Sequence, residues 1–454
     1  MPVRRLLWLT ILLCLLPCSS ASASRAQSLT FEAPRDLMNP ITRPAALNEL
    51  ESLGVRSLRV NLTWSTVAPG AGEAQKPPFE PTDPDAYAWG EYDALMAAAK
   101  ARDWPVLLTV TGPVPRWATK SKLDNRTRPS APAFAAFMTA VGRRYGEQVS
   151  TWSIWNEPNQ PQFLRPQFAD GGRATSPLIY RSLFLAGQRG LRKAGQGDDT
   201  ILLGETSPRG TSRVVAPLTF LRGALCLDRE YKRVGKCAPL SAGGYAHHAY
   251  TTRQGPTFKP PPNDVTIGVL SRLSTALDRA RRAGALTEKL PIHLTEFGIQ
   301  STPDTLSGVS LAKQVEYRAI SEKIAYDNPR VVSFSQYLLR DSDPTGPKQY
   351  DGFESGLRFA DGRPKPSLPA FRLPLAVTRR GSKASIWGLV RPAIGSTSAT
   401  ISYANKGSSR FLPLKTVQTN ALGYFTLQTT YRAGRRWNVS AQGHTGSPVG
   451  AYSR

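Results

Sequence analysis

Two glutamates follow short apolar segments that have the composition of β-strands. The segment 149–155 ends in Asn156-Glu157-Pro158, and the segment 290–295 ends in Glu296-Phe297-Gly298. Proline disfavours the helical region for the residue before it, so the first segment is expected to stop at Glu157. If both carboxylates lie at one site, they are the groups that glycosidic cleavage needs, one as a proton donor and one as a nucleophile or base.

Strand-like and helix-like segments alternate from residue 28 to about residue 372, and this alternation predicts how the two glutamates are positioned. Helices with recognisable ends are expected over 131–145, 176–194 and 267–283. The pattern favours an α/β fold, a (β/α)8 TIM barrel, with a doubly wound sheet as the alternative. In a barrel the functional residues lie after the strands, at their C-terminal ends. The predicted strands begin near Ser28, Ser57, Pro105, Ser150, Thr200, Ala242, Pro291 and Val331.

The last part of the chain, residues 373–454, has a different composition. Prolines punctuate the crossing from the barrel, and short β-rich segments separated by turns follow, beginning near residues 385, 398, 412, 424 and 437. This predicts a small all-β, Ig-like sandwich. Its aromatic residues Trp387, Tyr403 and Tyr431 are either carbohydrate contacts or part of its core.

The first 23 residues have the layout of a secretory signal peptide. A basic start with Arg4 and Arg5 precedes an apolar run, and Ala21-Ser22-Ala23 resembles a cleavage site. Lipid attachment at Cys18 is the alternative, although Pro17 fits it poorly. No apolar run is long enough to span a bilayer, so we expect a secreted chain without stable membrane insertion, whose catalytic domain covers residues 24–372.

The chain of 454 residues has a formal net charge of +25. Its basic residues are scattered and accompany no nucleic-acid-binding motif, so a nucleic acid is not an expected partner. A solvated basic surface is one interpretation, and attraction to an anionic polysaccharide or the cell envelope is the other. Outside the predicted signal peptide the chain has two cysteines, Cys226 and Cys237, which in an oxidising compartment are expected to form a disulfide.

The two glutamate motifs resemble those of the retaining glycoside hydrolases of clan A, the group that includes families 5 and 39. The resemblance covers about residues 28–372. It implies that Glu157, after the fourth strand, is the acid/base and that Glu296, after the seventh, is the nucleophile. It also implies a carbohydrate substrate, and Asn156 as a partner of the sugar 2-hydroxyl.

Further positions agree with the same resemblance. Arg59 lies where the clan has an arginine near the nucleophile, and His248-Ala249-Tyr250 resembles a motif whose tyrosine donates a hydrogen bond to it. These neighbours favour the ionised form of Glu296. The chain departs from the clan after the eighth strand, where Tyr337 lies near the usual position of a tryptophan that contacts the sugar. The full set of expected substrate-binding residues is Asn156, Arg59, His248, Tyr250, Trp64, Trp155 and Tyr337, with Trp117 as a further aromatic candidate.

These residues predict a glycosidase that cleaves a poly- or oligosaccharide, with β-linkages favoured, by double displacement. A carboxyl separation of roughly 5 to 5.5 Å would support retention of configuration. Two alternatives stay open. A metal-dependent hydrolase would need a cluster of histidine and carboxylate ligands, for which the four histidines offer few candidates. A non-catalytic carbohydrate- or cell-envelope-binding barrel is the other. No cofactor or metal motif is present in the sequence.

Overall fold

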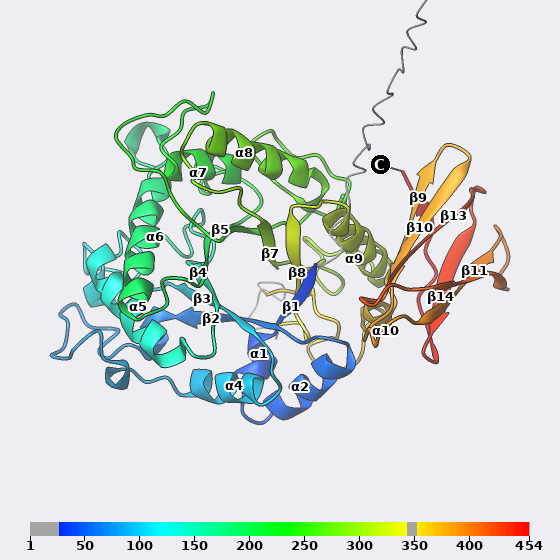
Figure 1. The fold of residues 1–454 in the computed structure, drawn as a ribbon, viewed down its shortest axis with the longest axis horizontal. Helices are drawn as coiled ribbons and strands as arrows, with labels where there is room; N and C mark the ends of the chain where they lie inside the picture. Colours follow the sequence, from blue (N-terminus) through cyan, green and yellow to red (C-terminus); the bar gives the residue numbers. More distant parts are fainter. Residues whose placement is uncertain (1–26, 343–351, 454) are drawn as a thin grey trace, which may run out of the picture.

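The computed structural model describes residues 27–342 and 352–453. They form a (β/α)8 barrel followed by a β-sandwich that packs against one side of it (Figure 1). The predicted signal peptide, residues 1–23, lies outside the described residues.

Eight parallel strands form the closed barrel, in the order of the sequence. The seam is made by the first and last strands, where Glu32 is in register with Tyr337. A closed parallel sheet is covered on both faces, which explains why the residues of these strands are almost continuously buried. The strands are β1 (Ser28–Glu32), β2 (Leu58–Thr63), β3 (Val106–Thr111), β4 (Thr151–Ile154), β5 (Thr200–Thr206), β6 (Gly244–His248), β7 (Ile292–Glu296) and β8 (Val331–Tyr337).

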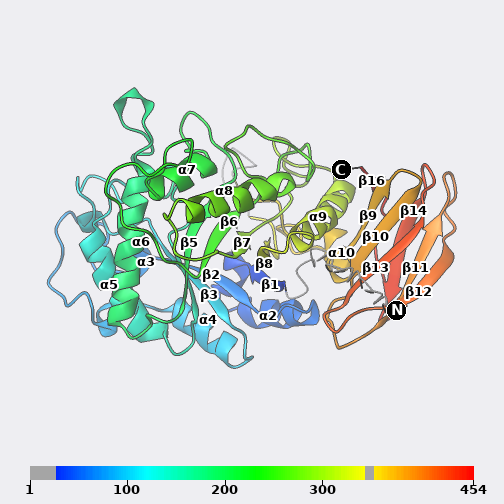
Figure 2. The ribbon, with the colours of Figure 1, turned by 45° about the horizontal axis from the view of Figure 1, so that its top comes forward.

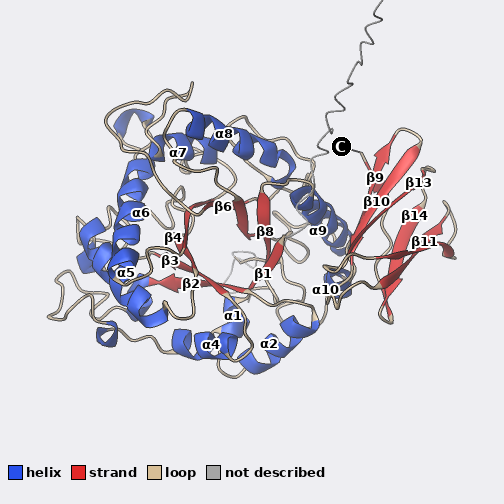
Figure 3. Cartoon of the chain, viewed as in Figure 1, coloured by secondary structure: helices blue, strands red, loops and turns tan. Residues whose placement is uncertain are grey.

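Helices surround the barrel on its outer face (Figure 3). Helix α5 begins after Ser130, whose side chain accepts a hydrogen bond from the Ala133 backbone N–H, as expected of an N-cap. Several helices have a proline in their first turn, where the missing N–H costs no helical hydrogen bond and the proline favours the start of the helix. The larger helices are α2 (Arg43–Ser52), α4 (Glu91–Lys100), α5 (Ala131–Tyr145), α6 (Ser176–Lys193), α7 (Pro217–Ala224), α8 (Leu270–Arg282) and α9 (Leu311–Tyr326).

The C-terminal domain consists of two four-stranded sheets, in the orders β13-β10-β9-β16 and β12-β11-β14-β15. Its core lies between the sheets and is centred on Trp437, which is fully buried. The strands are β9 (Leu375–Arg380), β10 (Lys383–Leu389), β11 (Ser398–Ala404), β12 (Leu412–Gln418), β13 (Tyr424–Thr430), β14 (Arg436–Ala441), β15 (His444–Thr445) and β16 (Ala451–Tyr452).

The two domains meet along α9 and the short helix α10 (Ser367–Arg372), as Figures 1 and 2 show. Trp387 of β10 contacts Tyr326 of α9 at 5.6 Å between ring centroids and is 1% exposed. The possibility that Trp387 binds carbohydrate is therefore wrong, because its ring is covered by the barrel. Tyr403 and Tyr431 are half-buried and contact the sandwich core.

The expected disulfide is present between Cys226 and Cys237, in the segment that follows α7. The predicted boundary after residue 372 falls between α10 and β9. None of the helices over 27–342 and 352–453 has the length and apolar content needed to cross a bilayer.

Candidate active site

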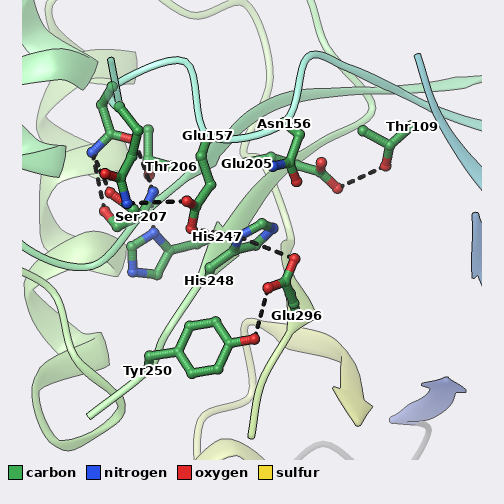
Figure 4. A network of polar contacts seen from close by, with 12 residues as sticks. Thr109, Asn156, Glu157, Glu205, Thr206, Ser207, His247, His248, Tyr250 and Glu296 are labelled. Atoms are coloured by element: carbon green, nitrogen blue, oxygen red, sulfur yellow. Dashed lines mark hydrogen bonds and ion pairs between the residues drawn. The ribbon is translucent and has the colours of Figure 1, made fainter. Parts of the chain in front are cut away.

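Four glutamates converge at the C-terminal ends of the barrel strands. Glu32 ends β1, Glu157 follows β4, Glu205 lies near the end of β5, and Glu296 ends β7. The parallel strands bring these residues together although they are far apart in the sequence. Figure 4 shows three of them, Glu157, Glu205 and Glu296, around His248.

Arg59 of β2 is at the centre of this group. Its Nη1 donates to Glu296 Oε2 at 3.1 Å and also to Glu32, and its Nε and Nη2 donate to the two oxygens of Glu205 at 3.1 and 2.7 Å. Nη2 donates in addition to Asn156 Oδ1 at 2.7 Å. Arg59 is thus a buried cation held by three carboxylates, and its planar guanidinium fixes their relative positions.

Glu157 and Glu296 are linked by His248 of β6. Its Nδ1 lies 2.9 Å from Glu157 Oε1 and 3.6 Å from Glu296 Oε2. Those two oxygens are therefore no farther apart than the sum of the two distances, about 6.5 Å. The two carboxylates are therefore close enough to contact one small ligand between them.

Glu296 also accepts a hydrogen bond from Tyr250, whose hydroxyl lies 2.6 Å from Oε1 (Figure 4). Each of its carboxylate oxygens therefore has a donor, Tyr250 on Oε1 and Arg59 on Oε2. Glu157 has a second partner too, because Gln160 Nε2 donates to its Oε2 at 3.1 Å. Both carboxylates are thus held in fixed orientations by donors from other strands or loops.

Exposure separates the four glutamates into two pairs. The side chains of Glu157 and Glu296 are 14% and 10% exposed, whereas those of Glu205 and Glu32 are 0% and 3% exposed. Of the four, only Glu157 and Glu296 are exposed enough to contact a ligand. Glu205 and Glu32 are therefore suited to holding Arg59 and not to contacting a ligand.

Burial and neighbouring charges shift the pKa values of the buried groups. Burial alone would raise the pKa of Glu205, but Arg59, followed by His248, outweighs it and holds this pKa below its usual value. Burial raises the pKa of Glu32 to about 7, since Arg59 only partly offsets it and Glu296 adds repulsion. Burial would lower the pKa of His248, yet the carboxylates of Glu296 and Glu157 raise it. His248 is therefore suited to carry a proton beside the two carboxylates.

The backbone turns sharply where the carboxylates leave their strands. Strand β4 ends at Ile154, earlier than the sequence predicts, and Trp155 and Glu157 then adopt φ values of 75° and 38°. Glu205 has a φ of 50°. Such angles are uncommon for residues with a Cβ and collect at functional sites, where surrounding contacts maintain them. One such contact is the hydrogen bond from Glu157 N–H to the Glu205 carbonyl at 3.0 Å.

Three tryptophans that were expected to contact the sugar do not face the site. Trp64 is fully buried and stacks on Phe137 of α5, with ring centroids 5.0 Å apart. Trp155 is fully buried under the end of β3, where a Cβ at Gly112 would lie 2.7 Å from its ring. Trp117 is 7% exposed and packs edge-on to Trp64. The predicted substrate contacts of Trp64 and Trp155 are therefore wrong, because both rings belong to the core.

Tyr337, at the end of β8, does lie beside the glutamates. Burial, and next the negative charge of Glu296, raise the pKa of Tyr337. Its ring contacts Phe353 edge-on at 5.1 Å, and Phe353 also lies 6.0 Å from Tyr250. Phe353 is 39% exposed, so it presents an aromatic surface next to the residues around Glu296.

Sequence reasoning missed Glu32, Gln160 and Phe353. Glu32 could have been found, since it directly follows the first predicted strand, but no neighbouring motif marks it. Glu205 is the bidentate partner of Arg59. Asn156 contacts Arg59 and lies beside Glu157, so it is near the site where the sequence places it.

Within the described parts of the chain, no cluster of three or more His, Cys, Asp or Glu side chains is arranged to hold a metal ion. His247 is fully buried, with Nε2 donating to the Val265 carbonyl at 2.7 Å and Nδ1 2.9 Å from Thr206 Oγ1. Burial lowers the pKa of His247 to about 4. This histidine is a neutral structural residue.

The structure is thus a (β/α)8 barrel with a pair of accessible carboxylates, Glu157 and Glu296, at its C-terminal face. Solved structures with a similar fold include a glucosidase from Croceicoccus marinus, at 10% identity and a TM-score of 0.54 over 92% of this chain and 96% of that one. They also include a β-glucosidase from Pyrococcus furiosus, at 12% identity and a TM-score of 0.48 over 77% and 95%.

A third similar structure is β-glucuronidase 2 from Bacteroides uniformis, at 10% identity and a TM-score of 0.47. The match covers 94% of this chain and 46% of that one. No protein-family model matches the sequence, and no curated protein matches it either. At 10% identity, the likeness to the glucosidase from Croceicoccus marinus supports the fold alone, so the function has to be argued from the site.

Proposed function

We propose that this protein is a glycoside hydrolase that cleaves a poly- or oligosaccharide with retention of configuration. The observation that carries the proposal is the pair Glu157 and Glu296, joined through His248 and the only two of the four glutamates with appreciable exposure. Arg59 and Tyr250 support it, because both donate to Glu296 and so favour an ionised nucleophile.

In the first step the Glu296 carboxylate attacks the anomeric carbon and the bond from that carbon to the glycosidic oxygen breaks. Glu157 in its protonated form donates its proton to the departing oxygen, which leaves as an alcohol. A glycosyl ester on Glu296 remains. Arg59 and Tyr250 then face a neutral ester in place of a carboxylate, so their hydrogen bonds change most during this step.

In the second step a water molecule attacks the same anomeric carbon. Glu157, now ionised, accepts a proton from this water, and the ester bond to Glu296 breaks to regenerate the carboxylate. Two displacements at one carbon restore its original configuration. His248, 2.9 Å from Glu157 Oε1, is placed to stabilise the ionised form of Glu157 between the steps.

The test incubates the full-length chain with β-glucans, mannans, xylans, galactans and anionic polysaccharides and measures new reducing ends. We expect release by the wild type and by Glu230→Ala, an exposed control, and none by Glu296→Ala. The configuration of the first sugar released, read by NMR before mutarotation, should be that of the substrate.

Other outcomes would change the proposal. Equal release by wild type and Glu296→Ala would overturn the assignment of the nucleophile. Binding of a polysaccharide without any release would support a non-catalytic carbohydrate-binding barrel instead. An inverted first product would leave a glycosidase but remove the covalent intermediate.

We also propose that the mature protein is secreted, with residues 1–23 removed. The layout of that segment and the Cys226–Cys237 disulfide support export to an oxidising compartment. The net charge of +25 makes anionic polysaccharides and the cell envelope further candidate partners. N-terminal sequencing of the protein recovered from the medium of an expressing culture tests the cleavage, and an N-terminus at Met1 would contradict it.

A further inference from the structure

Charge is distributed unevenly between the two domains. The β-sandwich, residues 373–454, contains eleven lysines and arginines and no aspartate or glutamate, so all 33 acidic residues of the chain precede it. A surface that serves only to keep a domain in solution usually mixes both signs of charge. The sandwich therefore has a large positive excess that its own side chains do not compensate.

Most of these cations lie at one end of the sandwich. Three segments meet there, one around each of the turns that join β9 to β10, β11 to β12 and β13 to β14. They span residues 379–383, 405–411 and 431–436, and together they have seven exposed lysine and arginine side chains. We call these three segments the basic tip.

Strand register brings the first and third segments together. Lys383 at the start of β10 is in register with Arg380 of β9 on one side and with Thr430, the last residue of β13, on the other. The Tyr431 N–H donates to the Ser382 carbonyl at 2.9 Å. The two turns are therefore neighbours, although they are about 50 residues apart in the sequence.

Arginines join the second segment to the third. Arg435 donates from Nε and Nη2 to Asn405 Oδ1 at 3.0 and 2.9 Å, and its guanidinium lies 4.2 Å from the ring centroid of Tyr403. Arg436 Nη2 donates to the Ser408 carbonyl at 3.3 Å. Arg435 is 8% exposed and holds the two turns together, whereas the other seven cations of the basic tip are exposed.

The exposed cations of the basic tip lack a counter-charge. None of the seven forms an ion pair with a residue of 27–342 or 352–453. At the opposite end of the sandwich, the turns 390–397 and 419–423 contain one cation, Arg391, which is buried and pairs with Glu322 of α9. The cation that joins the domains thus has a carboxylate partner, and those of the basic tip do not.

The aromatic rings of the basic tip are already in contact with guanidinium groups. Arg379 lies 4.5 Å from the ring centroid of Tyr431, and Arg436 lies 5.9 Å from that of Phe411. Both rings are half-buried. Rings engaged in this way offer little free face on which a neutral sugar or a nucleic-acid base could stack. A ligand at this end would therefore be recognised by its negative charge.

We propose that the basic tip binds an acidic polysaccharide, one that carries carboxylate, sulfate or phosphate groups. Exposed cations without partners in the fold attract such a polymer over its whole length. The recognition of a polyanion does not depend on the proposed glycosidase activity. The choice of a polysaccharide over a nucleic acid does rest on it, because the barrel of the same chain has a site suited to carbohydrate. A polymer held at the basic tip stays close to that barrel.

The experiment measures affinity in the full-length Glu296→Ala background, so that no turnover is needed. The probes are alginate, a polymer of uronic acids, its neutral propylene glycol ester, and single-stranded poly(dT). The tip variant carries Arg380→Gln, Lys406→Gln and Arg432→Gln, one exposed residue from each segment. The control variant carries Arg229→Gln, Lys232→Gln and Lys236→Gln, three exposed residues that follow α7 of the barrel.

Both variants lose the same charge, so only its position differs. We expect the affinity for alginate to fall at least roughly 5-fold in the tip variant and less than about 2-fold in the control, at low ionic strength. A second tip variant, Arg380→Lys with Arg432→Lys, keeps the charge and should bind alginate like its parent. The neutral ester should bind more weakly than alginate, and equally to all variants.

Three results would overturn the proposal. Equal losses in the tip and control variants would mean that alginate responds to net charge alone. Equal affinity for alginate and its ester would mean that charge is not recognised. Tighter binding of poly(dT) than of alginate at the basic tip would identify a nucleic acid as the ligand. If alginate binds at the tip as expected but the wild type cleaves no polysaccharide, the proposed hydrolysis fails and the binding site stands.

Discussion

The hydroxyl of Tyr250 is the shortest contact of Glu296 among the distances given above, and its loss should be visible in kinetics. We predict that Tyr250→Phe lowers kcat/KM by roughly 10- to 100-fold, because hydrogen bonds to a charged group contribute about 1.5 to 3 kcal/mol. Tyr245→Phe is the matched control, since its buried hydroxyl lies 3.2 Å from Thr206 and contacts no carboxylate of residues 27–342 and 352–453. Equal losses in the two variants would indicate a structural effect alone.

Glu32 should make stability depend on pH. Its pKa is about 7 in the folded protein against an ordinary 4.5, so the folded state binds the proton more tightly than the unfolded one. The resulting stabilisation is present below pH 4.5 and is lost as the pH rises to 7 and above.

Glu32→Gln has no carboxyl group to titrate at this position. Its unfolding free energy relative to that of the wild type should therefore rise by roughly 2 to 3 kcal/mol as the pH increases from 4.5 to 8. Denaturant unfolding of both proteins across this range measures the difference. A constant difference would show that Glu32 keeps an ordinary pKa.

Among single residues, those that belong to recognisable motifs could be identified from the sequence. Glu157, Glu296, Arg59, His248 and Tyr250 lie together where their motifs place them. Trp64 and Trp155 do not lie where they were expected. An aromatic residue at a strand end has the same local sequence pattern whether it faces a ligand or the core. Only the packing around it, such as Phe137 against Trp64, decides the direction.

Among the elements, the stability of strands β5 and β6 depends on the neutral form of His247. Its pKa of about 4 lies below the ordinary 6.5, so its contribution is complete above pH 6.5 and is lost as the pH falls to 4. We predict a loss of about 3 kcal/mol in unfolding free energy over that window, and a flatter dependence in His247→Gln. His444→Gln, an exposed control, should follow the wild type.

The order of elements could be predicted well from the sequence. Apolar strands and capped helices gave eight strand starts that lie within about two residues of those observed, and helix 131–145 has the predicted bounds. The sequence did not reveal β9, β15 or β16. The last two have two residues each, too short for any alternation to be recognised.

For the whole molecule, Trp387 should couple the two domains. We predict that Trp387→Ala costs roughly 3 to 5 kcal/mol and lowers the calorimetric transition of the barrel as well as that of the sandwich. Trp437→Ala is the control, because Trp437 is buried inside the sandwich alone. Its effect should fall mainly on the sandwich transition. Identical thermograms for the two variants would contradict coupling through Trp387.

The seam between β1 and β8 has a consequence for how the protein is made. It puts Glu32 in register with Tyr337, so residues from opposite ends of the catalytic domain meet only when the ring closes. A chain still being synthesised, or cut short before β8, keeps Arg59 and its glutamates but not the enclosure that holds them. Molecules that lack β8 should therefore lack the proposed activity, which requires the last strand of the barrel.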